Sequence, residues 1–345
     1  MIRNKVTLTA AVLITVLFLS IPSWAESTTL EDEGIKDKTA LQQAEALYIK
    51  KHRPVPRAAP QITLGITQGF DSNVNLNYSK KTDSYTEESL DIRHTFALVP
   101  RTTNLKLKFF ADNQSYYNIT DVDIFDGVGE VILEHKLADR LILIGGYALE
   151  ELWYPNDERS TYISNEFSGG LRHFFTKRVY EKALYKYLIK NYAHRKRRLG
   201  SAVYTSDLRE DLRHTFEHEL GIYIFDTTKL KIMNRFVMND SNDQYYDYYT
   251  YNQYKFGVSA AHMLTKKLYV LGSFSFLRKL YEGRLTSDDG KSQKDSLYIA
   301  SGTVMYNLTK SVSLYGSYSY RENSTNEPLD KYVDNIYSGG IYYSF

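Results

Sequence analysis

The chain has 345 residues, of which 43% are apolar and 24% are charged, and it contains no cysteine. This composition excludes a disulfide framework, a thiolate metal site, a cysteine nucleophile and a lipid anchor on cysteine. The formal net charge is only +2, so no overall basic or acidic field suggests a nucleic-acid partner. Tyrosine is unusually abundant, with 31 residues.

Residues 1–25 are typical of a secretory signal peptide. Arg3 and Lys5 form a basic start, residues 10–21 are apolar, and residues 23–25 (SWA) supply small residues for cleavage. The apolar run is too short to cross a bilayer as a helix. We therefore expect the chain to be exported and cleaved, which leaves it formally neutral.

Residues 26–60 are predicted to form a periplasmic helix followed by a proline-rich linker. Within residues 39–51, Leu41, Ala44, Leu47 and Tyr48 recur at helical spacing. Three prolines in residues 54–60 end the helix and favour extended chain. The segment is interpreted as a spacer, with an adaptor for periplasmic partners or a plug for the lumen as alternatives.

From residue 61 to residue 345 the hydrophobic period changes from 3.6 to 2. In residues 62–70, Ile62, Leu64, Ile66 and Phe70 share one face, and small or polar residues occupy the other. About fourteen such segments follow one another, and short connections alternate with long polar ones. This pattern predicts an all-β fold, a transmembrane antiparallel up-and-down β-barrel with periplasmic turns and extracellular loops.

Two soluble folds are less consistent with this pattern. A β-sandwich rarely strings together so many long hairpins, and a β-solenoid would show a fixed repeat length. The long loops are predicted at residues 71–87, 118–123, 155–160, 194–205, 240–249, 282–294 and 322–331. In residues 141–149 both faces are apolar, so the sequence leaves open which face points outward.

The last strand carries the most specific signal. Ile341, Tyr343 and the terminal Phe345 fall on one face. An aromatic final residue after this alternation resembles the assembly signal that outer-membrane barrels present to the insertion machinery of Gram-negative bacteria. The resemblance implies an outer-membrane location.

A second resemblance lies at the start of the barrel. Residues 65–96, which include the DSNVN sequence at residues 71–75, resemble the opening hairpin of β-barrel porins encoded beside exopolysaccharide export genes. A similar turn opens the barrel domain of surface lipoprotein assembly modifiers. Either resemblance implies a barrel that conducts or translocates a substrate. The modifiers also carry a helical-repeat domain, whereas here a single short helix precedes the barrel.

The strand faces predict which basic side chains line the lumen. If the alternation holds, the interior contains Arg93, Lys106, Lys108, Arg172, Lys182, Lys186, Lys190, Arg209, Arg213, Lys231 and Arg235. Fewer acidic residues are expected there, which favours a mild preference for anions. The competing hypothesis is a lumen whose opposite charges pair across the strands and neutralise one another.

Two loops suggest surface chemistry. Arg195, Lys196, Arg197 and Arg198 fall in a predicted extracellular loop, where they could bind lipopolysaccharide phosphates or an acidic polymer, or simply be solvated. The loop at residues 240–249 is rich in oxygen ligands but lacks the glycine and glutamate positions of the helix-loop-helix calcium site. No metal site is therefore expected.

The expected function is passage of a polar solute or an exported polymer across the outer membrane. The alternatives are a translocator of surface lipoproteins and a non-conducting barrel that displays binding loops. No cofactor and no enzymatic activity are expected, because the sequence contains no nucleophile-elbow, metal-ligand or phosphate-loop motif. Expected partners are outer-membrane lipid, lipopolysaccharide, the barrel insertion machinery and components of an export system, but not nucleic acid.

Overall fold

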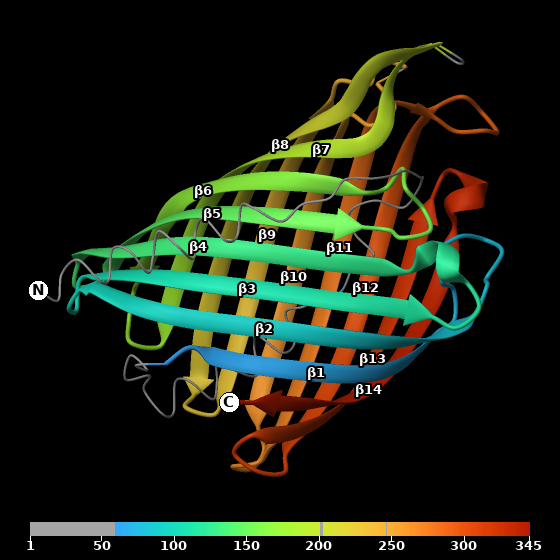
Figure 1. Ribbon diagram of the computed structural model, residues 1–345. Helices are drawn as coiled ribbons and strands as arrows, with labels where there is room; N and C mark the ends of the chain where they lie inside the picture. Colours follow the sequence, from blue (N-terminus) through green and yellow to red (C-terminus); the bar gives the residue numbers. More distant parts are fainter. Residues whose placement is uncertain (1–58, 201–202, 246) are drawn as a thin grey trace, which may run out of the picture.

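The computed structural model describes residues 59–200, 203–245 and 247–345, and they form one closed β-barrel (Figure 1). All neighbouring strands are antiparallel and consecutive in sequence, and β14 pairs with β1 to close the cylinder. The predicted fold and the predicted number of strands are therefore confirmed. The predicted signal peptide and the helix at residues 39–51 lie outside the described residues.

The fourteen strands are 11 to 23 residues long. Their bounds are β1 Gln61–Asp71, β2 Asp83–Val99, β3 Thr103–Tyr116, β4 Ile124–Ala138, β5 Leu141–Trp153, β6 Tyr162–Phe174, β7 Val179–Gly200, β8 Val203–Phe225, β9 Thr228–Ser241, β10 Tyr251–Met263, β11 Leu268–Leu285, β12 Ser292–Asn307, β13 Val312–Thr325 and β14 Tyr332–Ser344. Two short 3-10 helices, η1 Thr120–Val122 and η2 Pro328–Asp330, lie in connections.

The seam between β1 and β14 depends on small residues. Gly340 lies opposite Thr67, and a Cβ atom at Gly340 would overlap the carbonyl oxygen of Ile66. Gly65 lies opposite Tyr342, whose ring covers it and stacks on Tyr315 at a centroid distance of 4.9 Å. Glycine at these positions lets the first and last strands approach closely enough to pair.

The two faces of the wall meet different surroundings. On β1 the outward side chains Leu64, Ile66 and Phe70 are 45%, 60% and 41% exposed, while the inward Thr63 and Thr67 are buried. The open question at β5 is settled: Leu143 is exposed on the outside, and Ile144 is buried inside. A closed barrel leaves no unpaired strand edge, and its apolar exterior matches lipid.

These features place the chain in the outer membrane of a Gram-negative bacterium. None of the helices in residues 59–200, 203–245 and 247–345 is long and apolar enough for a membrane span.

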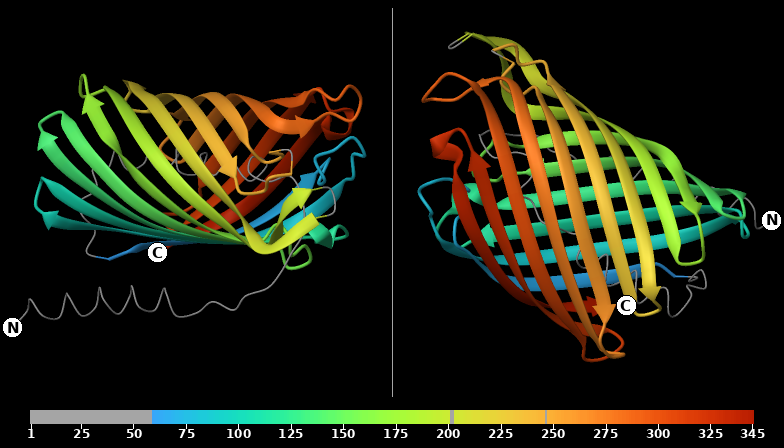
Figure 2. Two further views of the ribbon diagram at one scale, coloured as in Figure 1. Left: turned by 90° about the horizontal axis from the view of Figure 1, so that it is seen from above. Right: turned by 180° about the vertical axis from the view of Figure 1, so that it is seen from behind.

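The two ends of the barrel differ. Short turns join the strands at one end, which is the periplasmic end, and longer connections lie at the extracellular end. Hairpin β7–β8 projects beyond its neighbours at the extracellular end (Figures 1 and 2). Four of the predicted long loops, at residues 71–87, 194–205, 282–294 and 322–331, are too long: for example, β7 continues to Gly200, β8 begins at Val203, and β2 begins at Asp83. Outside the bilayer the outer face no longer needs apolar residues, so these strand extensions look like loops in the sequence.

Candidate functional site in the barrel interior

The barrel encloses a cavity of about 1650 Å³ that is lined by residues from every strand. Barrels of eight strands are filled by their own side chains, and barrels of sixteen or more leave an aqueous channel. Fourteen strands lie between these limits, so the side chains decide how much room remains. Here much of the lining is charged or hydroxylated.

The charges that line the cavity nearly balance. Thirteen are basic, namely Lys81, Arg93, Lys106, Lys108, Arg159, Arg172, Lys182, Lys186, Arg213, Lys231, Arg235, Lys255 and Arg321. Twelve are acidic, namely Asp71, Glu87, Asp91, Asp121, Asp126, Glu130, Glu134, Glu150, Asp157, Glu166, Glu217 and Glu219. The predicted excess of basic groups shrinks to one, because the sequence-based acidic set omitted several of these residues.

Nine of the eleven predicted lumen cations do line the cavity, and eight of them form ion pairs on the wall from β2 to β9. The pairs are Arg93–Asp91, Lys106–Glu134 (2.8 Å), Lys108–Glu130 (2.5 Å), Arg172–Glu134 (3.2 Å), Lys182–Glu217 and Lys182–Glu219 (both 3.5 Å), Lys186–Glu166 (2.9 Å), Lys231–Glu219 (3.7 Å) and Arg235–Glu217 (3.1 Å). The ninth, Arg213, donates hydrogen bonds to Asn239 and Tyr251. This geometry favours the hypothesis of a self-neutralising lumen.

Lys190 and Arg209 point inward but do not line the cavity. The Nζ atom of Lys190 lies 3.6 Å from the centre of the Tyr162 ring. The guanidinium of Arg209 lies 3.5 Å from the centre of the Tyr249 ring and pairs with Asp211 at 2.5 Å. Cation–π contacts of this kind are strongest where water is excluded. These two cations therefore hold the extracellular end together.

The predicted basic loop is part of strand β7. Arg195 donates a hydrogen bond of 2.5 Å to the hydroxyl of Tyr249, and Arg198 pairs with Asp243 at 3.2 Å. Arg197 lies 3.9 Å from Asp207, and Lys196 is exposed. The prediction of a loop is wrong here, because β7 and β8 continue to pair beyond the membrane. Arg195 and Arg198 hold the next extracellular loop through Tyr249 and Asp243, and of the four basic residues only Lys196 is exposed for binding an external phosphate.

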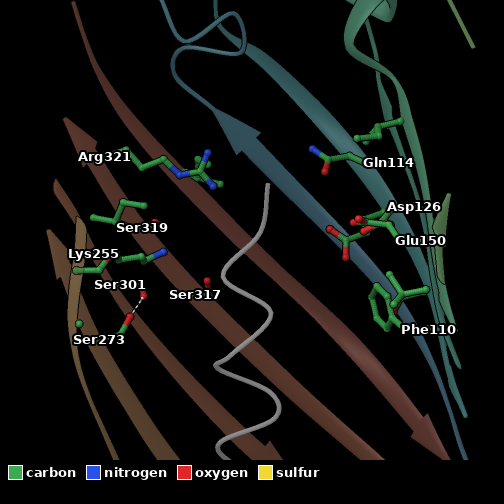
Figure 3. A pocket seen from close by; sticks show the side chains of 18 of the residues that line it. Phe110, Gln114, Asp126, Glu150, Lys255, Ser273, Ser301, Ser317, Ser319 and Arg321 are labelled. Carbon is green, nitrogen blue, oxygen red and sulfur yellow. Dashed lines mark hydrogen bonds between the residues drawn. The ribbon is translucent and has the colours of Figure 1, made fainter. Parts of the chain in front are cut away.

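The opposite wall, from β10 to β14 and β1, is lined by small hydroxylated residues. Ser259 lies opposite Ser273, Ser273 opposite Ser301, and Ser301 opposite Ser319. A second row joins Thr303, Ser317 and Ser338. The Oγ atoms of Ser273 and Ser301 form a hydrogen bond of 2.6 Å, which is the dashed line in Figure 3. We call the four residues Ser259, Ser273, Ser301 and Ser319 the serine row.

The outer surface carries the histidines near the periplasmic end. Glu181 lies between His173 and His218, with N···O distances of 3.7 Å to each. His135 and His262 each form a hydrogen bond with a threonine, at 2.9 and 2.8 Å. In the part of the chain that the structure describes, no group of three or more His, Asp or Glu residues could hold a metal ion. The absence of an enzymatic activity stays a prediction.

The C-terminal residues lie where the predicted assembly signal requires them. Ile341, Tyr343 and Phe345 are 53%, 44% and 64% exposed on the outer face. The backbone N–H of Phe345 donates to the carbonyl of Ile62 at 2.9 Å, beside the barrel seam. Their recognition by the insertion machinery stays a prediction.

No family model matches the chain, and no curated protein matches it in sequence. Among solved structures it is similar to OmpT of Vibrio cholerae, with 12% identity over 83% of this chain and 98% of that one and a TM-score of 0.46. An anion-selective porin from Comamonas acidovorans shows 9% identity over 83% and 99%, with a TM-score of 0.46. A Pseudomonas aeruginosa FadL homologue shows 9% identity over 82% and 89%, with a TM-score of 0.47. We therefore derive the function from the chain's own lumen.

Proposed function

We propose that the barrel is a water-filled channel through which polar solutes cross the outer membrane. The cavity lined by charged and hydroxylated residues from every strand carries this proposal. Ionised side chains inside a closed barrel need water or partners of opposite charge, since burying an unpaired charge is costly. A barrel that only displayed loops could fill its interior with apolar side chains, as small barrels do.

The near balance of charges supports weak selectivity. Rings of one charge set the selectivity of a channel, whereas pairs within one wall cancel at short range. We therefore propose that potassium and chloride permeate at comparable rates. The mild anion preference suggested by the sequence is replaced by this expectation.

Single-channel recording in planar bilayers tests the function. The full-length mature chain in KCl should give discrete conductance steps. The same protein without residues 26–57 provides a comparison for the proposed periplasmic segment. Absence of conductance from both proteins would overturn the channel.

Transport of an exported polymer and translocation of surface lipoproteins are supported by the sequence resemblances alone. Co-purification of the barrel from its native outer membrane distinguishes them. Recovery of a polysaccharide-export component would favour the first, and recovery of an outer-membrane lipoprotein would favour the second. Conductance without either partner would leave the general solute channel as the function.

A further inference from the structure

We propose that the wall from β10 to β13 contains a binding site for a hydroxyl-rich anion, such as a sugar acid or a sugar phosphate. The site consists of the serine row together with Lys255 and Arg321, which come from β10 and β13, the two outer strands of the row, and lie toward its extracellular end. This inference names the substrate class of the channel and so rests on the proposed function.

The first observation is that these two cations differ from those of the opposite wall. Within the described residues, neither Lys255 nor Arg321 has a carboxylate within ion-pair distance, although both line the cavity and Arg321 lies near enough to Asp71 to interact with its charge. Asp334 is the neighbour of Arg321 on β14, but its Oδ1 atom accepts a hydrogen bond from Ser72 instead. In Figure 3 the side chains of Arg321 and Lys255 extend from the wall into the cavity.

The second observation concerns Ser259 at the β10 end of the row. It lines the cavity, is only 7% exposed, and its Oγ atom has no hydrogen-bond partner in the part of the chain that the structure describes. A buried hydroxyl without a partner costs free energy. A solute that reached this hydroxyl would satisfy it.

The spacing of the groups fits a solute of sugar size. Lys255 lies on β10 and Arg321 on β13, which are three strand spacings apart, or about 14 Å along the wall. Both cations lie toward the extracellular end of the serine row, since Arg321 is two residues after Ser319 on β13 and Lys255 is four residues before Ser259 on β10. Long cationic side chains can reach inward to oxyanions, while the serines offer neutral donors and acceptors to hydroxyl groups.

The facing wall fixes the side on which an anion binds. Asp126 and Glu150 lie across the cavity from the serine row (Figure 3). Their negative charges repel an oxyanion, so it is held against Lys255 and Arg321. Lys255 and Arg321 then recognise the charge of the solute, and the serine row on the same wall recognises its hydroxyl groups.

The test measures how probe solutes reduce single-channel current in the full-length mature protein. D-Glucuronate should give a saturable reduction, while glucose, which lacks the charge, and propionate, which lacks the hydroxyls, should bind at least about tenfold more weakly. Comparing the current reduction by glucose 6-phosphate with that by glucuronate shows whether the site prefers a phosphate or a carboxylate. Equal reduction by glucuronate and propionate, or by glucuronate and glucose, would overturn the site while leaving the channel intact.

Variants locate the site. Lys255→Met and Arg321→Met should each weaken glucuronate binding about tenfold, because each removes one charged hydrogen-bond donor. The double change of Ser301→Ala and Ser319→Ala should reduce the difference between glucuronate and propionate. Lys266→Met removes the same charge from an exposed periplasmic turn and should change nothing. Unaltered glucuronate binding in both cation variants would contradict the proposal.

Equilibrium dialysis of the detergent-solubilised full-length barrel with labelled glucuronate separates the two proposals. If the protein fails to conduct but binds glucuronate in a way that depends on Lys255 and Arg321, the channel function fails and the site stands. If it conducts but binds no glucuronate, the site fails and the channel stands.

Discussion

The Nζ atom of Lys106 lies 2.8 Å from the Oε1 atom of Glu134, and both side chains point into the lumen from neighbouring strands. The same oxygen of Glu134 accepts from Arg172 on β6 at 3.2 Å. The carboxylate of Glu134 on β4 therefore partly neutralises two cations, Lys106 from β3 on one side and Arg172 from β6 on the other. Glu217 and Glu219 have the same arrangement with cations of β7 and β9.

Removing this shared carboxylate should shift the channel toward anions. Glu134→Gln keeps the shape of the side chain but leaves Lys106 and Arg172 without their negative partner. The chloride-to-potassium permeability ratio, measured from the reversal potential in a KCl gradient, should rise about twofold. Asp139→Asn removes a negative charge from an exposed periplasmic turn and is the matched control. An equal ratio in wild type and Glu134→Gln would show that this pair does not act on permeating ions.

Much of the barrel could be predicted from the sequence, for a physical reason. Within the membrane each strand meets lipid on one side and water or polar groups on the other, and this imposes a strict period of two. The pattern was therefore clear in segments such as the one that contains Leu105, Lys106, Leu107 and Lys108. It is weak in β5, where the inward Ile144 is apolar although it lines the cavity.

The extracellular end could not be predicted in the same way. Beyond the bilayer both faces of β7 and β8 meet water or protein, so the alternation disappears although the backbone pairing continues. Several of the abundant tyrosines, including Tyr116, Tyr251 and Tyr342, face the interior. The predicted lumen set lacks Arg321, although its spacing of two from Ser319 and of four from Ser317 is a signal that places it on the lumen face.

The loop at residues 242–250 should depend on Tyr249. Its ring is contacted by Arg209, and its hydroxyl accepts a hydrogen bond from Arg195. Tyr249→Leu keeps apolar volume but removes the hydroxyl and the π face, so the loop should lose about 1–2 kcal/mol of local stability.

Hydrogen exchange of the folded protein measures this local effect. Protection of the backbone amides from exchange should fall in residues 242–250. The barrel itself should stay folded, which is measured by its different migration in gel electrophoresis without heating. Tyr254→Leu, on the outer face of β10, is the control. Unchanged exchange in the loop of Tyr249→Leu would contradict the role given to this cluster.

Selectivity should depend on pH through Asp157, in the extracellular connection between β5 and β6. Burial raises the pKa of Asp157 to about 6, against the opposing effect of Arg159, and Asp157 lines the cavity. Its carboxyl group is neutral below this value and negative above it. Preference for potassium over chloride should therefore increase between pH 5 and pH 7, with an inflection near pH 6 (about one unit either side).

Reversal potentials across this pH range check the expectation. Asp157→Asn should remove the inflection without abolishing conductance, because the amide keeps the size of the side chain but does not titrate. An inflection that persists in Asp157→Asn would assign the titration to another group.

The terminal aromatic residue should matter for assembly more than for stability. Phe345 is 64% exposed, and its ring meets that of Tyr343 edge-on at 4.7 Å. An exposed side chain in lipid contributes little to folding, but it is available to a receptor before insertion. Phe345→Ala should therefore lower the amount of barrel in the outer membrane of cells several-fold, measured by fractionation and surface proteolysis.

The purified variant should refold in detergent as well as the wild type, since the backbone hydrogen bond from residue 345 to Ile62 does not need the ring. Leu314→Ala, which removes another apolar side chain from the outer face near Ile341, is the control for lost lipid contact. Equal loss of membrane-inserted protein in Phe345→Ala and Leu314→Ala would mean that the C-terminal residue acts only as one more lipid contact.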